Sequence, residues 1–111
     1  MGGDAKPAVP ALIEALQDSY MGVRGGAAHA LGHIHSDPGI VVPALMKSLH
    51  DPDANVRAHA AAALGEFGTN GRPAVASLVE LLSETNQDAS NAATNALKTI
   101  DPDAASRAGV K

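Results

Sequence analysis

Two histidines separated by one helical turn, His29 and His33, have the spacing in this sequence that most directly suggests chemistry. On one face of a helix, two imidazoles so spaced can bind a single metal ion. His59 or Glu66, on a neighbouring helix, could supply a third ligand. An alanine-rich helix can equally expose histidines that bind no metal. We predict that these histidines are solvated or contact a partner. We therefore expect neither a metal nor a cofactor.

Other kinds of catalytic chemistry find little support in the sequence. Cysteine is absent, which excludes disulfides, thiolate chemistry and Cys-based zinc sites and is more typical of an intracellular protein. We find no Ser/His/Asp order, no phosphate-binding glycine loop and no pair of carboxylates suited to acid–base catalysis. These observations predict a protein that is not an enzyme and is located in the cytoplasm.

Charge and hydropathy also limit the classes of partner. The net charge is −4, with both signs scattered along the chain, so no basic surface for a phosphate backbone is expected. No stretch approaches the roughly 18 apolar residues that a membrane helix needs. We therefore predict a protein or peptide partner, and neither nucleic acid nor membrane.

An internal repeat determines how these side chains are positioned. Three segments align without a gap at an offset of 33 residues, which is the difference between positions 9 and 42 and between positions 42 and 75. The aligned positions include Val9/Val42/Val75, Leu16/Leu49/Leu82, Asp18/Asp51/Glu84, Ala27/Ala60/Ala93 and Leu31/Leu64/Leu97. Such regular recurrence is the signature of stacked structural repeats. The chain is predicted to be a single domain over residues 1–111, with repeats at about 7–36, 40–69 and 73–102.

Each repeat contains two amphipathic stretches with the 3/4 spacing of a helix face. In the first repeat, the second stretch has Val23, Ala27, Ala30, Leu31 and Ile34 as its expected buried stripe. Prolines at positions 7, 10, 43 and 73 lie near the expected start of a leading helix, where a missing N–H is tolerated. The pattern predicts six helices, at roughly 7–18, 21–34, 39–50, 54–67, 72–84 and 87–100, followed by a polar cap and tail at 101–111. The fold class is therefore all-α: a right-handed α-solenoid.

The sequence of the first repeat from Val9 to Asp18, with Val23-Arg24 and the run from Ala27 to Gly32, resembles a HEAT repeat of the phycobilisome-lyase-like type. The second repeat resembles it even more closely. The resemblance implies that the second helices line a concave surface, on which we place the partner-binding residues His29, His33, His59, Glu66 and Asn95. It also implies an Asp/Arg ladder between repeats, formed by Asp18, Arg24, Asp51 and Arg57. HEAT-form deoxyhypusine hydroxylases would have His-Glu dipeptides after Val-Arg, and this chain has none.

The two ends of the array differ in sequence. The third repeat has Ser90 where the others have arginine and Lys98 where they have glycine, as expected of a terminal cap. The first repeat has no comparable polar coating, so either it continues a longer array or its surface pairs with another molecule, which includes self-association. We predict a non-catalytic scaffold for protein–protein interaction. The alternatives are a metal-binding or enzyme-associated module and the C-terminal part of a larger protein.

Overall fold

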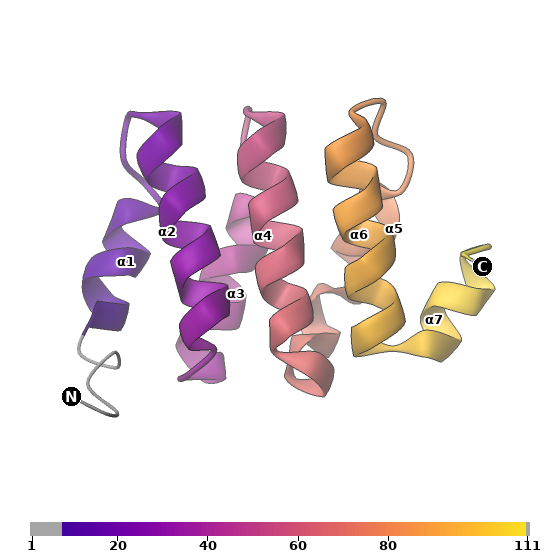
Figure 1. The fold of residues 1–111 in the computed structure, drawn as a ribbon. Helices are drawn as coiled ribbons and strands as arrows, with labels where there is room; N and C mark the ends of the chain where they lie inside the picture. The colour runs from indigo at the N-terminus through magenta and orange to yellow at the C-terminus, as the bar shows by residue number, and fades with distance from the viewer. Residues whose placement is uncertain (1–7, 111) are drawn as a thin grey trace.

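The structure is a computed structural model that describes residues 8–110, and the regular secondary structure in that range is all helical, without strands (Figure 1). Seven α-helices and one 3-10 helix lie between residues 8 and 110. They are α1 (Val9–Ala15), α2 (Met21–Ile34), α3 (Pro38–Ser48), α4 (Ala54–Glu66), η2 (Gly68–Ala74), α5 (Val75–Leu81), α6 (Gln87–Ile100) and α7 (Pro102–Arg107). The prediction of an all-α solenoid is confirmed.

The helices form two layers. α2, α4 and α6 lie side by side in one layer, with α1, α3 and α5 behind them (Figure 1). Short polar turns connect the layers, and side-chain caps mark where two of the second helices begin: Asp53 accepts hydrogen bonds from the N–H groups of Asn55 and Val56, and Asn86 accepts one from Ala89. Each repeat is therefore one helical hairpin stacked on the next.

One continuous apolar core runs between the two layers. Its largest fully buried side chains are Leu31, Leu45, Leu49, Leu64, Leu78, Leu97 and Ile100. Between the second helices the contacts are made by small residues, because Gly32 faces Ala63 and Gly65 faces Ala96. The stack is thus held together by leucines between layers and by glycine and alanine within the second-helix layer.

Two prolines do not lie in the first turn of a leading helix, where we predicted them. Pro43 lies inside α3 rather than in its first turn, because the helix begins at Pro38. Pro73 lies in η2, and α5 begins only at Val75. Pro7 lies outside the described residues.

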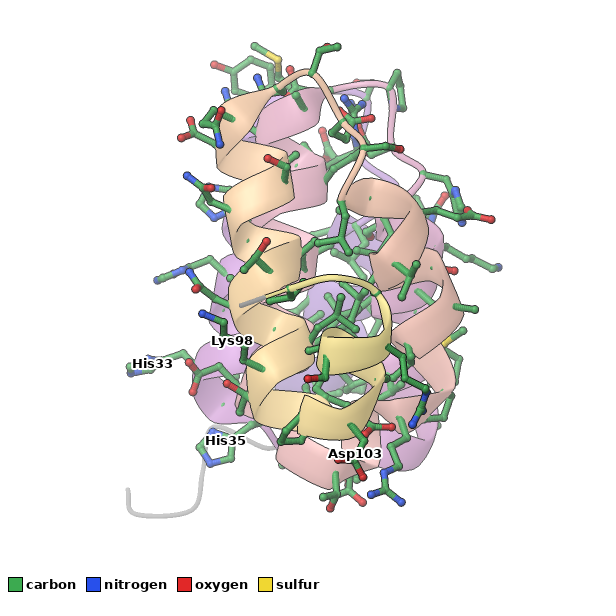
Figure 2. All side chains as sticks on the ribbon, turned by 90° about the vertical axis from the view of Figure 1, so that its right-hand side faces the viewer. His33, His35, Lys98 and Asp103 are labelled. Atoms are coloured by element: carbon green, nitrogen blue, oxygen red, sulfur yellow. The ribbon has the colours of Figure 1, made fainter. Side chains whose placement is uncertain are left out.

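The end of the chain differs from the prediction of a polar cap and tail. Residues 102–107 form α7, which packs against α6 and buries Ala104 and Ala105 (Figure 2). Asp101 caps this helix by accepting a hydrogen bond from the N–H of Ala104. A seventh α-helix therefore covers part of the C-terminal end of the stack.

The prediction that Val23 is buried was also wrong. We expected it in the buried stripe of the second helix, but 39% of it is exposed. Its counterparts in the next two repeats, Val56 and Ala89, are buried. Val56 lies next to Gly25 of the preceding repeat, and no hairpin within the described residues precedes Val23.

Candidate functional site

The residues predicted to contact a partner lie on one exposed surface. His29 and His33 are on α2, His59 and Glu66 on α4, and Asn95 on α6, and all five are at least partly exposed. His33 points outward from this layer (Figure 2). We call the outer surface of α2, α4 and α6, with these five residues, the second-helix face.

The three histidines gather where α2 meets α4. The ring centroids of His29 and His33 are 6.4 Å apart with nearly parallel planes, and those of His29 and His59 are 5.8 Å apart in an edge-on arrangement. They border a hollow of about 150 Å³ whose lining includes Gly32 and Ala63. Glu66 also borders it.

This histidine cluster is not arranged as a metal centre. Zinc holds each ligand nitrogen at about 2.0–2.1 Å, so rings sharing one ion must converge on a single point. Stacked rings present their faces to one another and do not converge in that way. Within residues 8–110, no three His, Cys, Asp or Glu side chains are placed to hold a metal ion.

A larger groove runs along the seam between α4 and α6. Its volume is about 560 Å³. The floor consists of small residues, Ala62, Gly65, Ala92 and Ala96, because the close approach of Gly65 to Ala96 leaves no large side chain in the seam. Polar and acidic side chains form its walls: Glu66, Asp88, Asn91, Asn95 and Thr99.

The charges of this groove have one sign. Glu66 and Asp88 are its only ionisable lining residues among those described, and both are exposed. Asp88 lies in the first turn of α6, whereas Glu66 ends α4 next to Gly65, which faces Ala96. Positions 88 and 96 differ by eight residues, so at 1.5 Å per residue the backbone positions that carry the two acidic side chains lie about 12 Å apart along the helix axis. The groove therefore carries a negative charge near each end.

The predicted ladder residues lie on the turns between the two layers. The guanidinium of Arg24 donates from Nε to one carboxylate oxygen of Asp51 at 2.8 Å and from Nη2 to the other at 3.1 Å. Its Nη1 donates to the main-chain carbonyls of Asp18 and Ser19 at 3.0 and 3.1 Å. Arg24 thus joins the first repeat to the second.

Arg57 repeats this arrangement one step further along. Its Nη2 donates to Glu84 at 2.7 Å, and its Nη1 donates to the carbonyls of Asp51 and Pro52 at 2.7 and 3.1 Å. Both ion pairs join residues 27 positions apart. The recurrence of the same contact in register shows that the hairpins are related by translation.

Comparison with known proteins agrees with this geometry. A family model described as HEAT repeats matches residues 9–98. The chain belongs to the HEAT-repeat family. No curated protein matches it. The match is to HEAT repeats in general, so the phycobilisome-lyase-like type stays a prediction.

In this HEAT-repeat protein the ladder also affects the titration of its members. Burial raises the pKa of Asp51, but hydrogen bonds from Arg24 and from the N–H of Asp53, with the positive charges of Arg24 and Arg57, outweigh it. The pKa of Asp51 is therefore below its ordinary value. The hydrogen bond to Asp51 raises the pKa of Arg24. Asp51 is the most enclosed of the four paired side chains, 8% exposed.

Sequence reasoning did not include Glu84 and Asp88 among the site residues of this HEAT-repeat protein. For Glu84 the signal was present, because it occupies the repeat position of Asp18 and Asp51. Asp88 aligns with Gly22 and Asn55, so the repeat gave no reason to single it out. Asp18 does not contribute its carboxylate to the ladder: it accepts a hydrogen bond from the N–H of Tyr20, and only its carbonyl contacts Arg24.

HEAT repeats commonly serve as scaffolds for protein interaction and are typically non-enzymatic. Within residues 8–110, no helix is both long enough and apolar enough to cross a bilayer.

Proposed function

We propose that this chain is a non-catalytic scaffold whose second-helix face binds a basic segment of a partner protein. The observation that carries the proposal is the α4–α6 groove, with two carboxylates and no basic side chain among its described lining residues. Electrostatic complementarity between a groove and its ligand contributes mainly to specificity and to the rate of association. A segment with lysine or arginine side chains is the complementary ligand.

The dimensions of the groove support a peptide rather than a small molecule. It extends from Asp88 to Thr99, which are eleven helical steps or about 16 Å apart along α6. An extended chain advances about 3.4 Å per residue, so about five residues fill this length. The spacing of roughly 12 Å between the backbone positions of the two acidic residues corresponds to basic residues three or four positions apart. The shallow floor of alanine and glycine leaves room for a peptide backbone.

The histidine cluster completes the binding surface in this proposal. His29, His33 and His59 border the next seam, so a longer ligand that leaves the groove past Glu66 contacts their rings. Imidazoles can donate or accept hydrogen bonds and can pack against apolar groups. The proposal includes no catalysis and no cofactor. The absence of cysteine supports a cytoplasmic location as part of the same proposal.

A random library of 12-residue peptides displayed on phage tests the proposal, because it offers the groove segments of every charge. Peptides selected on the wild-type chain should be enriched in lysine and arginine, with two basic residues three or four positions apart. The strongest binders are then synthesised with a fluorescent label, and their affinities are measured by anisotropy at low and at physiological salt. Affinity should fall as salt rises, because exposed charges are screened.

Variants identify the groove as the surface involved. An exposed ion pair contributes about 0.2–1 kcal/mol, so replacing both attractions by repulsions in the double variant Glu66→Lys, Asp88→Lys should weaken binding by about tenfold. The matched control is Glu14→Lys, Glu80→Lys, which changes the net charge equally at exposed positions of α1 and α5. Equal loss in both double variants, or selection of peptides without basic enrichment, would contradict the proposal.

A further inference from the structure

The end of the stack formed by α1 and α2 has the features of an inter-repeat contact that lacks its second half. Val23 is 39% exposed, whereas Val56 and Ala89, at the same repeat position, are 1% and 0% exposed. Ala30 is half-buried, whereas Ala63 and Ala96 are buried against a glycine in the second helix of the preceding repeat. Tyr20 and Met21, beside Val23, are 65% and 50% exposed. An apolar surface of this kind at one end of a stack marks an interaction site.

The Asp/Arg ladder also lacks one partner at the first repeat. Asp51 accepts Arg24, and Glu84 accepts Arg57, in each case from the preceding repeat. Asp18 occupies the same position in the first repeat. It is exposed, and no arginine or lysine within the described residues pairs with it. The first repeat therefore presents a carboxylate at the point where each later repeat receives an arginine.

We infer that this end, defined by Asp18, Tyr20, Met21, Val23 and Ala30, is a docking surface for the terminal helical hairpin of a partner HEAT-repeat protein. The partner's outer helix carries an arginine at the position of Arg24 and Arg57, and a glycine at the position of Gly32 and Gly65. The arginine bonds Asp18, and the glycine lies against Ala30. Two observations carry the inference. The proposed contact continues the hairpin-on-hairpin packing that already occurs twice in this stack, and the carboxylate of Asp18 is complementary in charge to an arginine.

A second copy of this chain does not supply that partner surface. At its C-terminal end, Ser90 occupies the arginine position and Lys98 the glycine position. In addition, α7 packs on α6 there (Figure 2). A head-to-tail copy would therefore offer no arginine to Asp18 and would bring a lysine to the site of closest helix approach.

The test uses a partner with a rebuilt C-terminal end. The probe is this chain with Ser90→Arg and Lys98→Gly, ending at residue 101, and with Asp18→Lys and Val23→Glu so that it cannot bind itself. The receptor is the wild-type chain. Sedimentation velocity of the mixture should show a 1:1 complex that neither protein forms alone. Receptor Asp18→Lys should raise the dissociation constant at least tenfold. Receptor Glu66→Lys, which changes the charge on the second-helix face instead, should leave it within twofold.

Two outcomes would overturn the inference: a probe that is folded by circular dichroism and does not bind, or binding that is indifferent to Asp18→Lys. A wild-type chain that dimerises by itself, and is dissociated by Val23→Glu but not by Asp18→Asn, would also overturn it, because a second copy would then cover this surface.

A second variant tests the surface even if the probe does not fold. A copy of residues 38–70 is inserted between residues 4 and 5, which places its arginine 27 positions before Asp18, as in the two existing pairs. The melting temperature should rise by about 5 °C or more over that of the wild-type chain. Asp18→Asn should lower it in the extended chain and leave it unchanged in the wild-type chain, since asparagine still accepts the Tyr20 N–H. An extended chain that is no more stable than the wild-type chain would contradict the inference.

Discussion

Gly32 of α2 lies so close to Ala63 of α4 that a β-carbon on Gly32 would stand 2.6 Å from the Cα of Ala63. Real β-carbons do not approach backbone so closely, and backbone cannot move aside as a flexible side chain can. The two helices can therefore be this close only because position 32 has no side chain. The same relationship, less tight, recurs between Gly65 and Ala96, at 3.2 Å.

Two glycines of α2 provide a matched pair of substitutions. Gly32→Ala should destabilise the fold by about 1–3 kcal/mol, because the added methyl overpacks the seam. Gly26→Ala should stabilise it by about 0.5–1 kcal/mol, since nothing lies within 4 Å of the new β-carbon and alanine favours helix. Urea unfolding curves of both variants measure the difference. Equal effects of the two substitutions would mean that the close approach does not contribute to stability.

Arg57→Met should reduce stability before it reduces binding. Methionine keeps most of the apolar stem but removes the hydrogen bonds to Glu84 and to the carbonyls of Asp51 and Pro52. We expect a loss of about 1–2 kcal/mol, with the affinity for groove-binding peptides unchanged at a temperature where the variant is folded. Thermal melts followed by anisotropy titrations separate the two effects. If affinity falls while stability does not, Arg57 belongs to the binding surface.

Asp51 should make the stability of the fold sensitive to acid. Its pKa is lower in the folded chain than its ordinary value, so the unfolded chain takes up the proton first as the pH falls. Its stabilising contribution is complete above about pH 5 and is lost as the pH falls through the folded-state pKa. The contribution should not exceed about 1 kcal/mol, the usual range for partly exposed ion pairs. Between about pH 5 and pH 3 the melting temperature of wild type should fall more steeply than that of Asp51→Asn, while Glu14→Gln should follow wild type.

Chelators should leave the melting temperature unchanged. The stacked rings of His29 and His33 do not converge on one point, and no group of three ligands is formed within residues 8–110. A ligand that binds only the folded state raises the melting temperature, so a metal module would lose stability in EDTA and gain it in added zinc. Differential scanning fluorimetry of untagged protein with EDTA, with zinc and with neither measures this. A zinc-dependent rise that disappears in His29→Ala would restore the metal-binding interpretation.

Sequence predicted the second helices better than the first ones. The bounds of α2 and α6 are as predicted, because polar turns and, for α6, an asparagine cap delimit them clearly. The leading helices were harder to delimit because prolines mark different positions in each: the second residue of α1, the interior of α3 and the 3-10 turn before α5. α7 was missed because its apolar residues are two adjacent alanines, too few for a periodic pattern.

For the candidate site, sequence could predict which residues share the second-helix face but not the shape of that face. His29, His33 and His59 follow from the repeat and the helical period. The groove depends on how closely α4 approaches α6 at Gly65, which is a packing distance and has no direct sequence signal. Asp88 becomes a groove residue only through that approach, which explains why it was not predicted.

The two ion pairs of the ladder, Arg24–Asp51 and Arg57–Glu84, which we call its rungs, differ in geometry. Shortening one acidic side chain by a methylene group tests this difference. Asp51 accepts both Nε and Nη2 of Arg24, whereas Glu84 accepts only Nη2 of Arg57. The Nε of Arg57 is buried and has no hydrogen-bond partner, which carries a desolvation cost. An aspartate already forms the two-pronged contact at the equivalent position, so Glu84→Asp should form it with Arg57 and stabilise the fold by up to about 1 kcal/mol.

The reciprocal substitution, Asp51→Glu, is the matched control and should destabilise the fold, because the longer side chain disturbs the two-pronged contact with Arg24 and the hydrogen bond that Asp51 accepts from the N–H of Asp53. Urea unfolding of the two single variants and of the double variant measures both effects, and additivity is expected only if the two rungs act independently. If Glu84→Asp proves as destabilising as Asp51→Glu, the geometry of Glu84 is the better one at that rung, and the unpaired Nε does not cost what its burial implies.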